Sequence, residues 1–258
     1  MTRARKRFGQ HFLHDASVVN RIVAAINPRP GEHLVEIGPG RGAITSLLLA
    51  ATGSLDAIEI DRDLTPLLRE RYDAQPGFRL HEDDALRFDF AALAAQRGGP
   101  LRVVGNLPYN ISTPLLFHLL RTPAALRDLH VMLQKEVVDR IIAPPGGGDY
   151  GRLTVMLAPW VEPARLFDIG PGAFSPPPRV WSSMLRLTVR PEPAFAVDGR
   201  FAILVAAAFS QRRKTLRNAI RNQLDAATIA ACGVDPGARP ETISPQQFAE
   251  LAQRMAAS

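Results

Sequence analysis

The sequence predicts an α/β protein: a mostly parallel sheet with helices on both faces and an antiparallel edge hairpin, followed by a small all-helical domain. Short apolar segments alternate with helical segments through the first 190 residues, and repeated strand–helix units build parallel sheets. The last two apolar segments of this part have no helix between them, which indicates a hairpin. From about residue 200 only helical periodicity remains. We therefore expect domains at residues 1–190 and 191–258.

The first half of the sheet domain has clear element boundaries. Asp15 can cap a helix whose apolar residues recur at helical spacing from Val18 to Ile26. A glycine-rich turn follows the first strand, and Pro66 is tolerated only in the first turn of its helix. The expected strands are 33–37, 55–61 and 78–81, and the expected helices are 16–26, 43–51, 62–72 and 88–96.

Proline and glycine also punctuate the rest of the chain. Gly105 turns the chain after an apolar strand, and Pro114 lies in the first turn of the next helix. The run from Pro144 to Gly148 indicates a loop. The expected strands here are 101–104, 129–133, 165–169 and 183–189, and the expected helices are 114–120, 135–142, 152–158, 201–209, 212–224, 226–231 and 245–256.

Composition narrows the class of protein. Hydrophobic residues make up 46% of the 258 residues and charged residues 22%, which is typical of a globular protein. The net charge of +6 indicates a polyanionic partner, with nucleic acid ahead of an anionic membrane. A single cysteine, Cys232, excludes an internal disulfide and a cysteine-rich metal site. No apolar run is long enough for a signal-peptide core or a membrane span. We expect a cytoplasmic protein with no bound metal.

Three successive strand ends carry groups that suit an adenosine with a small charged tail. The turn Gly38 to Gly42 lets a ligand approach the backbone, and Glu59 at the end of the next strand can accept hydrogen bonds from ribose hydroxyls. Asp84 follows the third strand and can pair with an exocyclic amine. A tight turn without a ligand and a solvated loop carboxylate are the alternatives. The turn also satisfies the G-x-G-x-x-A pattern of NAD-binding oxidoreductases.

The group Asn106-Leu107-Pro108-Tyr109 follows the fourth strand and faces the same crevice. If the Asn106 side-chain oxygen and the Pro108 carbonyl each accept one N–H of a planar amine, its lone pair turns toward a methyl donor. Tyr109 and Phe174 can clamp the two faces of the base. Catalysis would then be positioning and desolvation, without a general base. An ordinary strand–helix turn is the alternative.

These motifs resemble those of the ribosomal RNA adenine N6-dimethyltransferases of the KsgA type. The resemblance extends nearly from end to end, over segments 5–13, 36–40, 59–61, 84–85, 105–113, 132–136, 150–152, 174–179 and 211–218. It implies a Rossmann-like class I methyltransferase sheet and catalytic roles for Asn106, Leu107, Pro108, Tyr109 and Phe174. It also implies S-adenosylmethionine contacts at His11, Leu13, Gly38, Glu59, Asp84 and Asn106. The family more often has Asn at the position of His11, and a backbone contact would survive that change.

Family membership implies the substrate. Two neighbouring adenosines in a hairpin loop near the 3′ end of 16S rRNA, within a precursor of the small (30S) subunit, would each receive two methyl groups. The target base must leave its stack to reach the pocket. We expect the enzyme to act as a monomer without membrane contact. The related 23S rRNA adenine dimethyltransferases and a non-catalytic ribosome-assembly factor are the alternatives.

Two basic clusters are candidate RNA-binding sites. The first is the amino-terminal arm, with Arg5, Lys6 and Arg7. The second lies in the predicted helix 212–224, whose spacing puts several cations on one face. Its members are Arg212, Arg213, Lys214, Arg217 and Arg221. A solvated helix face is the alternative.

Overall fold

The computed structural model describes residues 10–211 and 213–255. The chain forms two compact units. One contains the chain up to Val138 together with Pro163–Pro191, and the other contains Asp139–Glu162 and the chain from Glu192 onward. The break at Pro191 lies next to the boundary expected at residue 190. Residues 139–162, which the sequence analysis assigned to the sheet domain, have their contacts in the second unit.

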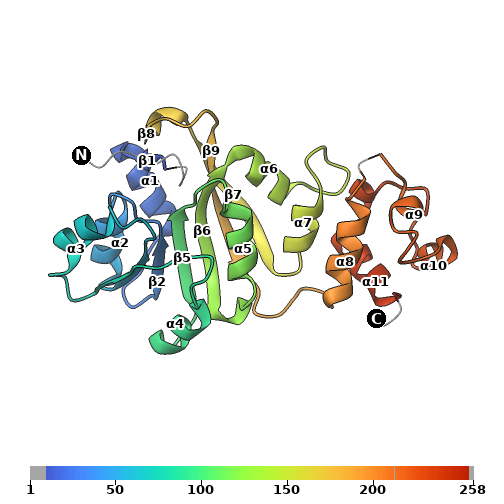
Figure 1. The fold of residues 1–258 in the computed structure, drawn as a ribbon, viewed down its shortest axis with the longest axis horizontal. Helices are drawn as coiled ribbons and strands as arrows, with labels where there is room; N and C mark the ends of the chain where they lie inside the picture. Colours follow the sequence, from blue (N-terminus) through green and yellow to red (C-terminus); the bar gives the residue numbers. More distant parts are fainter. Residues whose placement is uncertain (1–9, 212, 256–258) are drawn as a thin grey trace. The chain divides into compact units, whose positions relative to one another are not determined.

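The first unit is built on a seven-stranded sheet of order β4-β3-β2-β5-β6-β9-β7 (Figure 1). Strands β4, β3, β2, β5 and β6 are parallel, and β9 runs antiparallel to β6. The predicted mixed sheet with an antiparallel edge hairpin is therefore confirmed. The strands are β2 (Leu34–Ile37), β3 (Leu55–Ile58), β4 (Phe78–His81), β5 (Leu101–Asn106), β6 (Leu126–Gln134), β7 (Val161–Ile169) and β9 (Ser182–Val189).

Apolar side chains cover the inner strands on both faces. Every residue of β2 and β3 is buried, as expected of a parallel sheet with helices on either side. The helices of this part are α1 (Ala16–Ile26), α2 (Thr45–Thr52), α3 (Thr65–Tyr72), α4 (Phe90–Arg97) and α5 (Ser112–Leu119). Helix α6 (Lys135–Ile142) begins in this unit and ends in the second. Strands β6 and β7 are each four residues or more longer than expected, because sheet pairing extends past their apolar centres.

Helix α1 covers the face of the sheet that carries the cavity described below. Asp15 caps it, and its carboxylate accepts hydrogen bonds from the backbone N–H groups of Ser17 and Val18 at 2.8 and 3.1 Å. Its buried face, with Ile22 and Ile26, belongs to one core cluster with Met132 of β6 and Met184 of β9. The predicted cap and helical periodicity are both confirmed.

A second, two-stranded sheet was not expected from the sequence. Strand β1 (Phe12–Leu13) pairs antiparallel with β8 (Phe174–Ser175), and the His14 N–H donates to the Ala173 carbonyl at 3.0 Å. The two strands lie side by side in Figure 1. This pairing joins the start of the described chain to the proline-rich loop about 160 residues later.

The second unit contains helices around its own core, whose largest members include Phe201 and Phe248. These helices are α7 (Arg152–Leu157), α8 (Gly199–Ala208), α9 (Leu216–Ala219), α10 (Ala226–Ala231) and α11 (Pro245–Gln253). No helix of the described residues is both long and apolar enough to cross a membrane.

The prediction of one helix over residues 212–224 is wrong. Of the described residues in this range, Leu216–Ala219 alone are helical, although Leu216, Ile220 and Leu224 are buried at the helical spacing that suggested the longer element. The Leu216 and Arg217 N–H groups donate to the carbonyls of Ala238 and Pro236 at 2.7 and 3.1 Å. Since those donors are taken by another loop, they are not available to continue the helix toward its amino end.

Candidate active site

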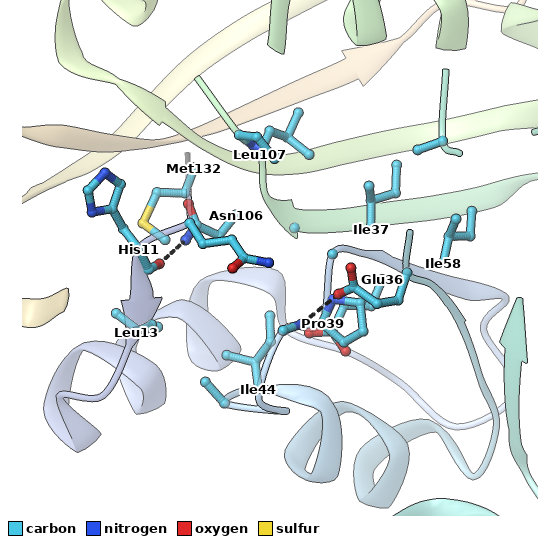
Figure 2. Close-up of a pocket in the computed structure, with 18 of the residues that line it drawn as sticks. His11, Leu13, Glu36, Ile37, Pro39, Ile44, Ile58, Asn106, Leu107 and Met132 are labelled. Carbon is cyan, nitrogen blue, oxygen red and sulfur yellow. Dashed lines mark hydrogen bonds between the residues drawn. The ribbon is translucent and has the colours of Figure 1, made fainter. Parts of the chain in front are cut away.

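A cavity of about 360 Å³ lies at the carboxyl ends of β2, β3 and β5, where ligands bind in open α/β sheets. Segment 10–13 and the turn after β4 complete its wall. Figure 2 shows His11, Leu13 and Asn106 on one side of it, with Glu36 and Ile58 on the other. The cavity brings together all the predicted catalytic and donor-binding residues except Phe174, namely His11, Leu13, Gly38, Glu59, Asp84, Asn106, Leu107, Pro108 and Tyr109.

The glycine turn after β2 forms the floor of the cavity. Gly38 and Gly40 have φ angles of 65° and 59°, in the left-handed region that favours glycine. The Gly38 N–H donates to the Ile58 carbonyl at 2.9 Å, which fixes the turn to β3. A side chain on Gly40 would come within 3.2 Å of the Phe12 ring, so segment 10–13 rests directly on this turn.

Glu59, just after β3, is held with both carboxylate oxygens against backbone donors. They accept from the N–H groups of Gly40 at 3.2 Å and Asp61 at 2.9 Å. Burial and, to a lesser degree, the charge of Asp61 raise the pKa of Glu59, while these hydrogen bonds lower it; the net effect is a raised pKa. Each oxygen keeps a lone pair, so the carboxylate can still accept from two ribose hydroxyls.

Glu36 is a second buried carboxylate in the cavity wall. One of its oxygens accepts a hydrogen bond from the Thr45 hydroxyl at 2.7 Å. Burial raises its pKa to about 7; the Thr45 hydrogen bond acts in the opposite direction and the nearby charge of Glu59 adds to the rise. From the sequence, Glu36 is identified only as part of a motif, because its chemistry depends on burial that a strand sequence does not reveal.

Asp84 is half-buried in the turn after β4. One carboxylate oxygen accepts from the Leu86 N–H at 2.9 Å, and no hydrogen bond to a described residue engages the other. Asp83 lines the same wall, and the Gln10 amide donates to buried Asp61 at 2.7 Å. This carboxylate-rich half of the cavity, with its open glycine backbone, fits an adenosine that carries a cationic tail.

The Asn106 amide is oriented by segment 10–13. Its Nδ2 donates to the His11 carbonyl at 3.0 Å, as Figure 2 shows. The amide oxygen has no hydrogen bond to any described residue and is therefore the atom available to a ligand. His11 makes this contact through its backbone, so the contact would survive a change of side chain. The predicted role of the Asn106 oxygen as an acceptor agrees with this geometry.

Tyr109 presents its ring to the cavity and anchors its hydroxyl on β9. The phenol oxygen lies 2.8 Å from the Ser182 hydroxyl, and its ring stacks with that of His11 at a centroid distance of 5.9 Å and an interplanar angle of 29°. The His11 ring is itself held by a 2.7 Å hydrogen bond between Nδ1 and the Pro176 carbonyl. Burial raises the pKa of Tyr109, and the Ser182 contact partly offsets that rise, so the phenol is neutral near pH 7.

Phe174 is placed differently from the other predicted residues. Its side chain is 2% exposed and belongs to the hydrophobic core, and it is not among the residues that line the cavity. Leu107 is 1% exposed and does line the cavity, and its N–H donates to the Met132 carbonyl at 3.2 Å. Tyr109 is therefore the ring of the predicted pair that a base could meet in this structure.

Several cavity residues were missed by the sequence analysis. Met132 pairs with Met184 across β6 and β9, and both side chains face the cavity. His130, two residues before Met132, also lines it and contacts the Asp128 carboxylate at 3.1 Å. The two-residue spacing along β6 puts His130 and Met132 on one face. Which face meets the cavity depends on the register, and the sequence does not contain that information.

The predicted basic residues are only partly described. Arg5, Lys6, Arg7 and Arg212 lie outside the described residues. Arg213, Lys214, Arg217 and Arg221 are exposed, and none has an ion pair with another described residue. Because α9 is short, these four cations do not share one helical face, and the predicted ridge is replaced by a cluster on a turn and a short helix.

A family model described as ribosomal RNA adenine dimethylase matches residues 1–257. This chain belongs to that family. The protein named ribosomal RNA small subunit methyltransferase A of Pseudomonas aeruginosa is 53% identical to it, over 98% of this chain and 95% of that protein. The protein of the same name from Pseudomonas putida is 51% identical over 98% of this chain and 96% of its own length.

Solved structures agree with the dimethylase assignment. The 23S rRNA methyltransferase ErmE matches with a TM-score of 0.71 and 27% identity, over 95% of this chain and 99% of that chain. A dimethyladenosine transferase from Plasmodium falciparum matches with a TM-score of 0.80 and 22% identity, over 93% and 96%. The predicted class I methyltransferase fold and the resemblance to the dimethyltransferases are confirmed, and the NAD-dependent alternative is discarded. Among the described residues, no cluster of three or more His, Cys, Asp or Glu side chains is arranged to hold a metal ion.

Proposed function

We propose that this chain transfers methyl groups from S-adenosylmethionine to the N6 amines of two adjacent adenosines in 16S rRNA. The target adenosines lie in a hairpin loop near the 3′ end, and the product is N6,N6-dimethyladenosine. The arrangement that carries this proposal is the opening of the Asn106–Tyr109 group and of Glu59 onto one cavity. The small-subunit name of relatives 51–53% identical to the chain supports the substrate.

The carboxylate-rich half of the cavity is assigned to the donor. The Glu59 oxygens would accept hydrogen bonds from the two ribose hydroxyls. The free oxygen of Asp84 would accept a hydrogen bond from the amine of the donor's adenine. The open backbone at Gly38, with Leu13 and the backbone of His11 opposite, would hold the rest of the molecule. S-adenosylmethionine supplies a methyl group on a positively charged sulfur, and the surrounding carboxylates favour that charge.

The other half of the cavity is assigned to the target adenosine. The Asn106 oxygen and the Pro108 carbonyl would each accept one N–H of the N6 amine, which directs the nitrogen lone pair toward the donor. Tyr109 would stack on the base and Leu107 would exclude water. The assignment of Phe174 to the second face of the base stays a prediction, and it requires the ring to leave the core.

Positioning and desolvation account for the catalysis. A neutral Tyr109 cannot take a proton at pH 7, and the carboxylates lie in the donor half. The residues need only hold the amine and the methyl donor in line, because correct orientation of two bound reactants by itself gives a large rate enhancement. The proton leaves the amine after transfer, when the positively charged nitrogen is acidic enough to release it to water.

The partners and the setting are proposed with the reaction. The substrate would be 16S rRNA within a 30S precursor particle, bound by the amino-terminal arm and by the exposed cluster Arg213, Lys214, Arg217 and Arg221. The enzyme would act in the cytoplasm as a monomer. The 27% identity to a 23S rRNA enzyme, against 51–53% to the small-subunit enzymes, favours the 16S substrate.

Methyl transfer from labelled S-adenosylmethionine to ribosomal subunits that lack these modifications tests the proposal directly. We expect label in 16S rRNA, mapped to two adjacent dimethyladenosines. Label confined to 23S rRNA would assign the chain to the other branch of the family. Binding of the small subunit without any transfer of label would favour an assembly factor and contradict the proposed activity.

A further inference from the structure

Trp181, in the loop before β9, is exposed but held in place. Its side chain is 54% exposed, whereas large aromatic residues are mostly buried in folded proteins. One edge of the indole lies against Gly170, where a side-chain carbon would sit 3.7 Å from the nearest ring atom. The Trp181 carbonyl accepts the Lys135 N–H at 2.9 Å. An exposed ring with a fixed backbone presents a flat apolar surface to a partner.

The backbone of Trp181 lies close to the candidate active site, and its ring rests on Gly170, just after β7. Trp181 directly precedes Ser182, whose hydroxyl is 2.8 Å from the Tyr109 hydroxyl. Ser182 pairs with Gln134 at the carboxyl end of β6, and Asn106 at the end of β5 pairs with Met132. Trp181 therefore lies at the same edge of the sheet as the acceptor half of the cavity, next to the residue that anchors its aromatic wall.

An exposed cation, Arg179, lies two residues before Trp181 in the chain. Its guanidinium has no hydrogen bond or ion pair with another described residue. The carboxylate of Asp168, on the neighbouring strand β7, is engaged by the Ser183 hydroxyl at 2.5 Å. A cation together with a flat ring is the combination by which proteins bind unpaired nucleotides, through phosphate contacts and base stacking. Val180, 40% exposed, extends the apolar surface.

We propose that Trp181 is a stacking platform for the unpaired base next to the target adenosine, with Arg179 on its phosphate. The proposal rests on the proposed function, because an RNA loop with two adjacent target adenosines places one base beside the cavity while the other is inside. The enzyme would thereby hold the second adenosine in reach while the first is modified. Loss of stacking on an aromatic side chain should weaken RNA binding about tenfold, or about 1.4 kcal/mol.

The first experiment compares Trp181→Ala with Trp181→Phe in the transfer assay on unmodified small subunits. We expect the alanine variant to raise the KM for subunits about tenfold with kcat nearly unchanged, and the phenylalanine variant to stay within about threefold of wild type. Ile203→Ala, which removes an apolar side chain that is 53% exposed in the other unit, is the matched control and should change neither constant. An unchanged KM in Trp181→Ala would overturn the proposal.

The second experiment identifies the stacked base. A synthetic hairpin is prepared with an abasic ribose in place of the adenine next to the target. Wild type and Trp181→Ala should bind this RNA with equal affinity, because the base that stacks on the ring is gone. If the losses of affinity from the abasic site and from Trp181→Ala add, the ring contacts something else. In the transfer assay on unmodified small subunits, wild-type transfer with no effect of Trp181→Ala refutes only this inference, whereas no wild-type transfer refutes the proposed function.

Fluorescence gives an independent reading of the same contact. The chain has two tryptophans, so Trp160→Phe leaves Trp181 as the sole indole. Binding of the intact hairpin should quench its emission strongly, and binding of the abasic hairpin should quench it weakly. Equal quenching by both RNAs, or none by either, would contradict stacking on the neighbouring base.

Discussion

The two halves of the cavity are built from contacts of very different range. The donor half comprises the turn after β2 and the ends of β3 and β4. Its hydrogen bonds from Asp61, Thr45 and Gly40 to the carboxylates span 2, 9 and 19 residues of sequence. The acceptor half comprises the end of β5 and the start of β9, and segment 10–13 contacts both halves. Its contacts Tyr109–Ser182, Asn106–His11 and His11–Pro176 span 73, 95 and 165 residues.

Because of this difference, binding of the methyl donor and recognition of the target base should depend on different parts of the fold. The donor site is made mostly of local turns, and its contact from Gln10 to Asp61 spans 51 residues. The acceptor site depends on contacts between three segments that are distant in sequence. It can therefore form only when the fold is complete. Substitutions in one half should therefore leave the other half functional, and the following variants test that independence.

Asn106→Ala should have the largest effect, because it removes the amide oxygen that would orient the amine and also the contact to the His11 carbonyl. At saturating S-adenosylmethionine we expect kcat to fall at least about a hundredfold, the range seen for loss of one orienting hydrogen bond in an active site. Binding of the small subunit should persist. Asn20→Ala, at an exposed position of α1, is the control. Near-normal turnover in Asn106→Ala would refute the role of the amide.

Glu36→Gln should change how stability depends on pH. Because burial raises the pKa of Glu36 from 4.5 to about 7, the folded chain holds a proton that the unfolded chain releases within this window. The free energy of unfolding therefore contains a term that falls as pH rises from 4.5 to 7, by about 3 kcal/mol in total. Glutamine does not titrate, so the variant loses this fall.

Urea unfolding at pH 5 and pH 8 measures the effect. The variant should gain stability relative to wild type as the pH rises, while Glu250→Gln, at an exposed position of α11, should follow wild type at both values. A difference between wild type and Glu36→Gln that stays constant with pH would show that the carboxyl group is not buried as described.

Glu59→Gln should break the donor half alone. The amide nitrogen would face the N–H of Gly40 or of Asp61, so one backbone hydrogen bond and one ribose contact are lost. We expect the affinity for S-adenosylmethionine to fall about thirtyfold, or about 2 kcal/mol, as measured by calorimetry. RNA affinity should not change, and Glu70→Gln on the exposed side of α3 is the control. A parallel loss of RNA affinity would mean that the two halves are coupled.

Neutralising the exposed cluster should have the smallest effect per residue. In the triple variant Arg213→Gln, Lys214→Gln and Arg217→Gln, the slope of log affinity against log salt should become shallower by about 2. The kcat at saturating subunit should not change. The control replaces three exposed arginines that are dispersed over the first unit, Arg29, Arg79 and Arg121, by Gln. Equal slopes for the two triple variants would show that the cluster is an ordinary solvated surface without a role in RNA binding.

The fold and the donor half could largely be predicted from the sequence because they depend on local patterns. The glycines at 38 and 40, and the carboxylate of Glu59 after the next strand, are features of one strand–turn–helix unit and the strand after it. Beyond β5, the antiparallel edge of the sheet was predicted because no helical segment separates the last two strands. The burial that raises the pKa of Glu36 was not visible, since it arises from packing around β2.

The acceptor half could be predicted only in part. Asn106 and Tyr109 were identified by their place after a strand, but their partners His11 and Ser182 come from distant segments. The pairing of Phe12 with Ser175 had no sequence signal, because two-residue strands carry too little pattern. The helix expected over 212–224 failed where tertiary hydrogen bonds from residues 216 and 217 to residues 236 and 238 overrode local periodicity.

The long-range Tyr109–Ser182 contact sets an order for events during synthesis. The glycine turn, Glu59 and Asp84 have all left the ribosome before Asn106 does, so the growing chain can build its donor pocket first. Tyr109 then waits for another 73 residues before Ser182 is made, and at typical translation rates that takes roughly 4 to 15 seconds. If the proposed assignment holds, a nascent chain would gain the ability to hold its cosubstrate before it gains the ability to use it.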